Sequence, residues 1–307
     1  MIYAAPVTEV TIFGLSSGAV FALLALGLVL IYRTTGVLNF AHWAIGLMAV
    51  VTYVMLTALG LPPQVAAALG LAVGVVSGVL AYRLVFKRLG RGRQVIVILI
   101  AIGLAQFYSS VAQFALGFEQ FTRLQPWLPA GDVHLGQVAI RASEIITAVA
   151  AIVIAFGFLV WFRLSRTGRA LRAVAQNKEA AMLAGIDDVK YSSIAWGIGS
   201  ALAALALLLV MPHSAGEQGG IITTFDVTPF GTLLIPAFGA ALVGGLVHLP
   251  MALLGGFVFG LSRELLILAP KPWSDLRASM AAILILFLLL LRTERFFATR
   301  QELEALE

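Results

Sequence analysis

Side chains with chemical reactivity are sparse in this sequence, and few stand at a spacing that a reaction could use. There is no cysteine, which excludes disulfides, thiolate metal sites and cysteine nucleophiles. The histidines show no metal-ligand spacing, and no Lys is followed by the Ser or Thr that a phosphate-binding P-loop requires. His-Glu-x-x-His does not occur. The sequence therefore predicts no metal site, no P-loop ATPase and no metalloprotease of the His-Glu-x-x-His type.

Two polar side chains, Asn39 and His42, interrupt an apolar stretch near the start of the chain. At such a depth an amide or an imidazole costs free energy unless it is paired or faces water. One interpretation is a hydrogen bond between helices, and the other is the lining of a transport pathway. Arg263 and Glu264 raise the same question, because adjacent residues on a helix do not face each other and each needs its own partner or an aqueous cavity.

One polar segment, residues 163–190, carries six basic and three acidic side chains. It must lie in water beside a bilayer, and its basic excess predicts the cytoplasmic side. We expect two short helices in it, at 168–175 and 178–184. Asn177 should cap the second helix at its start, and Gly185 should end it.

The second of these helices has a small apolar patch, Ala180, Ala181 and Met182, beside basic residues. An ordered loop with such a patch is typical of a docking surface for a soluble protein. The alternative is a loop whose positive charges only set the topology of the chain. Composition alone leaves both interpretations open.

The composition identifies the elements that must position these residues. Hydrophobic residues make up 61% of the 307 residues and charged residues 11%, whereas a soluble globular protein has about 25% charged residues. The fold class is therefore all-α, a polytopic transmembrane helical bundle that forms a single domain over residues 1–307. The sequence pI of about 9.8 reflects basic residues on one membrane face, and no nucleic-acid partner is expected.

Nine membrane spans are expected, within a range of eight to ten. The first nine residues contain no Lys or Arg and Arg33 follows the first span, so the N-terminus should lie outside. The last apolar run is short for a ~30 Å hydrocarbon core. The expected spans are 10–32, 36–59, 64–84, 94–117, 143–162, 191–211, 230–246, 251–268 and 278–291.

Glycines at regular spacing predict where helices approach closely. Gly70, Gly74 and Gly78 form a stripe at four-residue spacing, and we expect the third span to be an internal helix because of it. Two glycine pairs flank the short connection between the seventh and eighth spans, where they permit a tight inner turn and close helix contact. These pairs are Gly244, Gly245, Gly255 and Gly256.

Three motifs together resemble the permease family of branched-chain amino acid ABC transporters. Residues 163–190 resemble its cytoplasmic coupling loop, Leu-Asn-Phe-Ala-His at 38–42 is similar to a hallmark of the family, and so is the glycine-rich stretch 244–256. Two departures stand out. Asn177 and Lys178 replace the usual Asp-Pro, and Trp43 replaces a small Gly.

The resemblance implies the membrane-spanning permease subunit of an ATP-binding cassette importer for branched-chain or related amino acids, or small amides. It implies alternating access driven by two cytoplasmic ATPase subunits, with a second permease subunit and an extracytoplasmic solute-binding protein as further partners. The chain would lie in a bacterial or archaeal inner membrane, would bind no cofactor and would not be an enzyme, since the ATP is used by the partners.

The resemblance also assigns roles to residues. Four polar residues would line the substrate pathway, namely Ser16, Ser17, Asn39 and His42. Six residues would engage an ATPase subunit, namely Arg169, Arg172, Glu179, Ala180, Ala181 and Gly185. The alternative function is a stand-alone ion-coupled secondary transporter or channel, whose ion site would use Asn39, His42, Arg263 and Glu264.

Overall fold

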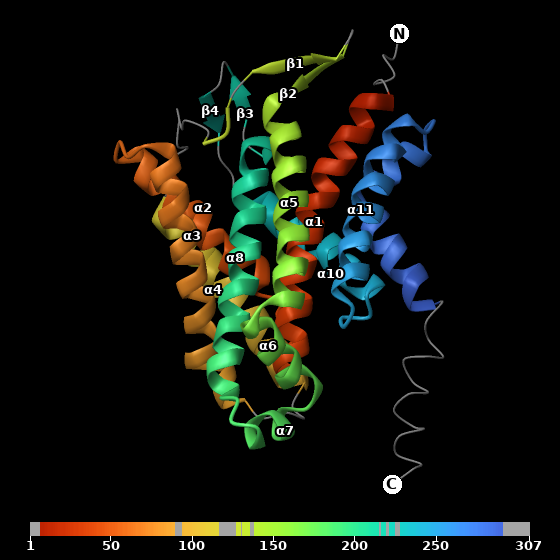
Figure 1. Cartoon of the computed structure of the whole chain (residues 1–307). Coiled ribbons are helices and arrows are strands. Elements are labelled where there is room, and N and C mark those ends of the chain that lie inside the picture. Colours follow the sequence, from red (N-terminus) through yellow and green to blue (C-terminus); the bar gives the residue numbers. More distant parts are fainter. Residues whose placement is uncertain are drawn as a thin grey trace.

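The structure of the chain is a computed structural model that describes residues 7–89, 94–116, 127–129, 131–135, 138–214, 216–218, 221–224 and 228–290. Within these residues the chain is mostly helical, and its long helices run up and down one bundle (Figure 1).

Six of the described helices are long and apolar enough to cross a membrane. They are α1 (Val7–Thr35), α3 (Pro63–Leu80), α4 (Gln94–Leu116), α5 (Ala142–Leu164), α8 (Asp188–Ser214) and α11 (Leu249–Leu265). Short turns extend two of them: η1 (Ala81–Val85) and η2 (Phe86–Arg88) follow α3, and η3 (Leu266–Leu268) follows α11. Three apolar segments are shorter, namely α2 (His42–Ala58), Phe230–Val243, which includes α10 (Leu234–Val243), and Met280–Leu290. Each predicted span has its counterpart, and the predicted polytopic α-helical bundle is confirmed.

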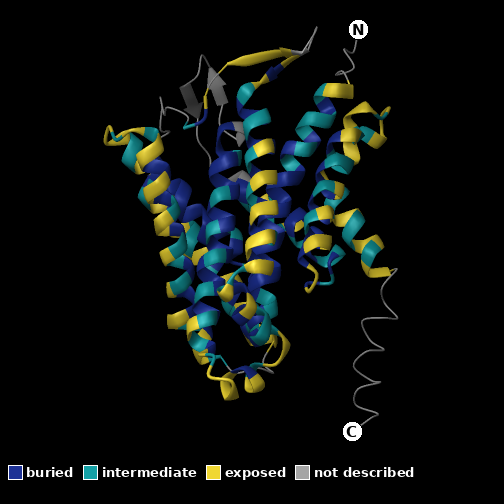
Figure 2. Ribbon diagram, viewed as in Figure 1, coloured by how far each residue is buried: buried dark blue, intermediate teal, exposed yellow. Residues whose placement is uncertain are grey.

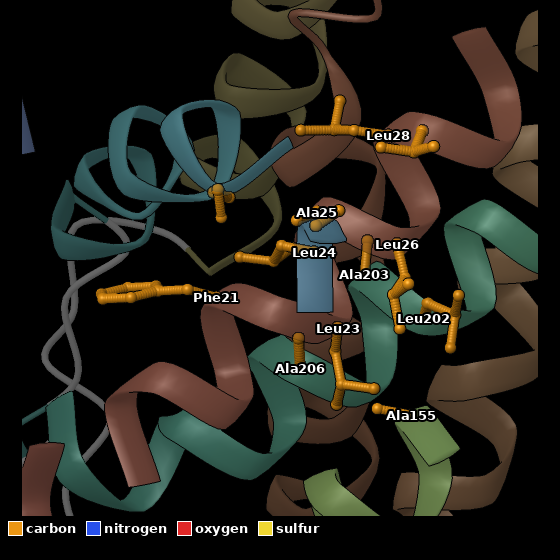
Figure 3. Packing of buried hydrophobic residues seen from close by; sticks show 14 of the residues in the cluster. Phe21, Leu23, Leu24, Ala25, Leu26, Leu28, Ala155, Leu202, Ala203 and Ala206 are labelled. Atoms are coloured by element: carbon orange, nitrogen blue, oxygen red, sulfur yellow. The ribbon is translucent and has the colours of Figure 1, made fainter. Parts of the chain in front are cut away.

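Helix α1 is the centre of the bundle. In its most apolar window of 18 residues, 89% of the residues are buried, against 22% for α4. Leucine and alanine side chains of α1 pack against Leu202, Ala203 and Ala206 of α8 and against Ala155 of α5 (Figure 3). A helix that is apolar on all sides and buried on all sides is expected where no face meets lipid or water.

Helix α3 is peripheral, so the expectation of an internal third helix was wrong. Only 39% of its most apolar window is buried, and it exposes an apolar face that includes Val73 and Val76 (Figure 2). Its three stripe glycines are buried, since a Cβ at Gly74 would lie 2.9 Å from Ala204 of α8. The glycine stripe marks the packed face of α3, and the opposite face of the same helix is exposed.

The second helix begins later than expected. Residues 36–41 are not helical, and α2 starts at His42 instead of position 36. Gly36 has a φ of 73°, and the hydroxyls of Thr34 and Thr35 bond to carbonyls of the preceding turn at the end of α1. Asn39 therefore lies in an irregular linker between two helices.

The two ends of the bundle differ in structure. The connection between α5 and α8 forms α6 (Arg166–Gln176) and α7 (Lys178–Leu183) at one end (Figure 1). The opposite end has two antiparallel hairpins that the all-α expectation did not include, formed by β1 (Asp132–Leu135) with β2 (Val138–Arg141) and by β3 (Gly216–Gln218) with β4 (Ile221–Thr224). α9 (Thr228–Thr232) and η4 (Trp273–Ala278) complete the described elements.

Single introduced cysteines test this orientation without interference, because the chain has no cysteine of its own. With His134→Cys in β1 and Leu183→Cys in α7, both exposed, an impermeant thiol reagent applied to intact cells should label only His134→Cys. Leu183→Cys should react only after the membrane is opened. Labelling of both positions in intact cells would place the two ends on the same side and contradict the topology.

Candidate coupling loop and buried polar residues

Helices α6 and α7 are both fixed at their starts by side-chain caps. The Ser165 hydroxyl accepts a hydrogen bond of 2.8 Å from the Gly168 N–H, and the Asn177 side chain accepts one of 2.9 Å from the Ala180 N–H. Such caps satisfy backbone donors that the first turn of a helix leaves free. The structure confirms the predicted role of Asn177, whereas sequence reasoning missed Ser165.

The end of α7 is a left-handed turn at Gly185, whose φ is 80°. The Gly185 N–H bonds to the Met182 carbonyl at 3.0 Å, and the Ile186 N–H to the Ala181 carbonyl at 2.9 Å. This pair of bonds is the Schellman motif, and a residue with a Cβ would be strained at this φ. The predicted helix end at Gly185 is confirmed.

Arg169 and Arg172 of α6 turn back onto the end of α5. Arg169 donates to the Leu164 carbonyl at 3.0 Å, and Arg172 donates to the carbonyls of Phe162 and Arg163. Cations at these positions satisfy the free carbonyls and complement the negative end of the helix dipole. The guanidinium of Arg172 also lies 5.4 Å from the centre of the buried Phe162 ring. Both arginines therefore hold the loop in place.

Lys178 ties the start of α7 to the start of α8. Its Nζ lies 2.5 Å from a carboxylate oxygen of Asp188, which is buried. Lys178 stands where the family pattern has a proline. The ion pair provides a tertiary contact at the joint where a proline would have restricted the backbone.

The exposed face of α7 is apolar with one acid. Glu179 and Ala180 are exposed, as are Met182 (48%) and Leu183 (92%), whereas Ala181 is buried. The expectation that Ala181 belongs to an exposed patch was therefore wrong: it faces the bundle. Leu183 was missed, although its place two residues after Ala181 could have signalled the opposite face of the helix. An exposed leucine and methionine therefore form an apolar surface at the tip of the braced loop.

Asn39 and His42 lie together in the packed interior. Asn39 is 2% exposed and its Oδ1 accepts from the Ala41 N–H at 3.1 Å, and His42 is 1% exposed. The imidazole has room beside α1 because Gly27 lacks a side chain: a Cβ at Gly27 would lie 2.7 Å from His42 Nε2. Gly27 and Gly199 also let α1 and α8 approach closely, since a Cβ at Gly27 would lie 2.8 Å from the Gly199 carbonyl. Neither Gly27 nor Gly199 was singled out from the sequence.

Several polar atoms of these two residues have no hydrogen-bond partner in the described part of the chain. They are Nδ2 of Asn39 and both ring nitrogens of His42. Leaving a buried polar group without a partner costs about 1–3 kcal/mol. Such a concentration is typical of a site that water, a ligand or a second conformation completes.

Trp43, the second departure from the family pattern, has a definite place. Its indole ring packs against Gly231 of α9, where an added Cβ would lie 3.4 Å from the ring. Gly231 therefore leaves room for the Trp43 ring, and α2 stays helical at this position.

Ser16 and Ser17 occupy different surroundings on α1. Ser16 is buried, whereas Ser17 lines a cavity of about 390 Å³ in the half of the bundle that holds the β-hairpins. Arg263, Glu264 and Arg277 line the same cavity. The structure therefore separates the serines from Asn39 and His42, which do not line this cavity.

The two charges within the eighth apolar run have a shared environment. Glu264 is buried and forms an ion pair with Arg277 of η4, and Arg263 Nε lies 3.9 Å from the other oxygen of Glu264. Each of these charges was expected to need its own partner or an aqueous cavity. Glu264 has such a partner, whereas Arg263 lies beside the same carboxylate and also lines the cavity.

The glycine pairs of the α10–α11 connection lie at turns and contacts. Gly245 has a φ of 60°, and a Cβ at Gly244 would meet the His248 carbonyl at 2.5 Å. In α11, a Cβ at Gly255 would lie 2.6 Å from the Ala240 carbonyl of α10, and one at Gly256 would lie 2.5 Å from the Ala22 nitrogen of α1.

The comparison with known proteins agrees with this arrangement. The sequence matches the model of the family described as branched-chain amino acid transport system, permease component, over residues 10–292. BraD of Pseudomonas aeruginosa, a high-affinity branched-chain amino acid transport system permease protein, is 30% identical, with 81% of this chain and 83% of BraD covered. LivH of Salmonella typhimurium, described in the same words, is 28% identical over 82% of this chain and 83% of its own length.

Among solved structures, a chain of PsaBC from Streptococcus pneumoniae in complex with Fab is similar with a TM-score of 0.50. The match covers 90% of each chain at 13% sequence identity. At that identity the likeness concerns the fold alone.

Proposed function

Because the chain belongs to the family of branched-chain amino acid transport permeases, we propose that it carries branched-chain or related amino acids, or small amides, across the membrane. The chain is the membrane-spanning permease subunit of an ABC transporter and lies in the inner membrane. Its substrate is inferred from BraD and LivH, whose names state a branched-chain amino acid transport system.

Four partner chains follow from the proposal: two cytoplasmic ATPases, a second permease subunit, which is a paralogue or another copy, and a solute-binding protein on the outside. ATP would be bound by the ATPases, because this sequence lacks a P-loop. The chain would move substrate without catalysing a reaction and without a cofactor of its own.

The observation that carries the coupling role is the braced loop with Met182 and Leu183 exposed at its tip. The side-chain caps of α6 and α7 and the Lys178–Asp188 ion pair hold residues 163–190 in a fixed arrangement. A force applied to α7 would therefore pass to α5 and α8. Such a rigid contact would convert closure of the ATPases into movement of the helices, which is the basis of alternating access.

Uptake into proteoliposomes tests the function. The chain, co-expressed with its partner permease and ATPase subunits, should accumulate radiolabelled leucine only when its binding protein is outside and ATP is inside. Unlabelled isoleucine and valine should compete, while ribose should not. Uptake that persists without ATP and collapses with an ion gradient would contradict the proposal and favour a secondary transporter.

We also propose that Asn39 and His42 line the pathway in another state of the transport cycle, where their unpaired atoms meet water or substrate. In Asn39→Cys, a small thiol reagent should then react at least tenfold faster during ATP hydrolysis than at rest. Ala44→Cys, equally buried on α2, is the matched control and should stay unreactive in both conditions. Equal protection of Asn39→Cys in every state would assign this residue to packing.

A further inference from the structure

A surface groove runs between α3 and α8 at the end of the bundle that holds the coupling loop. Its volume is about 520 Å³, and its walls are almost wholly apolar, with Val75 and Val79 from α3 facing Ile194, Ile198 and Ala201 from α8. Gly197 leaves room at its floor. Arg83 and Lys190 lie at the loop end of the groove and are the only charged residues that line it.

The two cations have no acidic partner within the described part of the chain. Arg83 donates to the Ser193 hydroxyl at 3.2 Å, and Lys190 is exposed. Of the two acids nearby, Asp188 is paired with Lys178, and Asp187 accepts from the backbone N–H of Lys190 and forms no ion pair with either cation among the described residues. The groove therefore has an apolar length and a positively charged end.

The dimensions of the groove match one leaflet of a bilayer. From Lys190 to Ala201 the helix rises about 16 Å at 1.5 Å per residue, which is roughly half of a ~30 Å hydrocarbon core. The flank of α3 beside it exposes Val76 and Leu80, as a surface that faces acyl chains does. The charged end then lies where lipid head groups begin.

We propose that this groove binds one anionic phospholipid from the leaflet on the side of the coupling loop. Its phosphate would lie between Arg83 and Lys190, and one acyl chain would follow the apolar walls toward Ala201. Basic pockets between membrane helices on this side recognise anionic head groups in the same way. A zwitterionic lipid would bring a positive amine to the same two cations and would bind more weakly.

An apolar helix of a second copy of this chain is the competing occupant, and the charges argue against it. The exposed faces of α4 and α5 carry no carboxylate at the loop end: no acid lies in α4, and α5 has Arg163 there. Such a helix would cover Arg83 and Lys190 without pairing them, which is costly in a dry contact.

Native mass spectrometry of the purified complex tests the proposal with phosphatidylglycerol and phosphatidylethanolamine as probes. The complex should retain phosphatidylglycerol, and the double variant Arg83→Gln/Lys190→Gln should retain at least about tenfold less at equal lipid concentration. The matched control Lys87→Gln/Arg88→Gln removes two exposed charges of η2 outside the groove and should behave as the wild type. Glycerol phosphate, which has the head group without the chains, should not compete.

Three results would overturn the proposal. The first is equal retention of both lipids by the wild type, and the second is equal loss of phosphatidylglycerol in the control variant. The third comes from a photoreactive group attached at Ile198→Cys, which should cross-link to phospholipid. A cross-link to protein alone would assign the groove to a subunit contact.

Discussion

Replacing Ala180 by Arg is expected to abolish uptake while leaving the permease inserted in the membrane. Ala180 is exposed on α7, and its backbone N–H, not its side chain, receives the Asn177 cap. The chain alone would therefore accommodate the new side chain. A partner that packs on α7 would have to bury an unpaired charge, which costs about 2–5 kcal/mol, or a roughly 30- to 4,000-fold loss at 1.4 kcal/mol per factor of ten.

Two measurements separate this loss of coupling from loss of folding. Uptake in proteoliposomes should fall below detection, and the ATPase subunits should no longer co-purify or should lose substrate-stimulated ATP hydrolysis. His134→Arg adds the same charge to an exposed position at the opposite end of the bundle and should leave ATPase association unchanged. Full uptake in Ala180→Arg, with ATPase bound, would mean that this loop only sets topology.

The second large effect is expected from Gly256→Leu, which should prevent the bundle from assembling. A Cβ at this position would meet the nitrogen and Cα of Ala22 in α1 at 2.5 and 2.6 Å. Overpacking costs about 1–3 kcal/mol where side chains can shift, and more is expected here because the atoms met are backbone. Detergent extracts should contain at least about tenfold less monodisperse permease, measured by fluorescence-detected size exclusion.

Gly103→Leu is the matched control for this substitution. It makes the same change in α4, where nothing lies within 4 Å of an added Cβ. The control should be recovered at the yield of the wild type. A normal yield of Gly256→Leu would show that α1 and α11 do not pack as closely as the structure has them.

Features that depend on neighbouring residues in the chain could be predicted from the sequence. The cap at Asn177 and the turn at Gly185 each follow from one residue type and the few positions around it. The apolar segments could be located for the same reason, because the length of a span is fixed by the bilayer. The start of α2 was placed too early, since the sequence 36–41 is apolar enough to continue a helix.

Features that depend on distant residues could not be predicted. A helix face that packs on protein and one that meets lipid are both apolar, so hydropathy could not show that α3 is peripheral. The place of His42 depends on Gly27, which belongs to another helix. The outward side of α7 is set by the packing of Ala181 on the bundle, and helical spacing places Leu183 opposite Ala181 without telling which of the two faces outward.

The close contact between α1 and α11 has a consequence for how the chain is made. Gly18 in α1 meets the backbone of Gly256 and Phe257 in α11, yet more than 230 residues separate the two partners in the sequence. At a synthesis rate of about 5–20 residues per second, the partner of the first helix emerges from the ribosome roughly 10–50 s later. During that interval α1 lies in the bilayer with its glycine face uncovered. Chains released before α11 is made would lack the partner that covers this face.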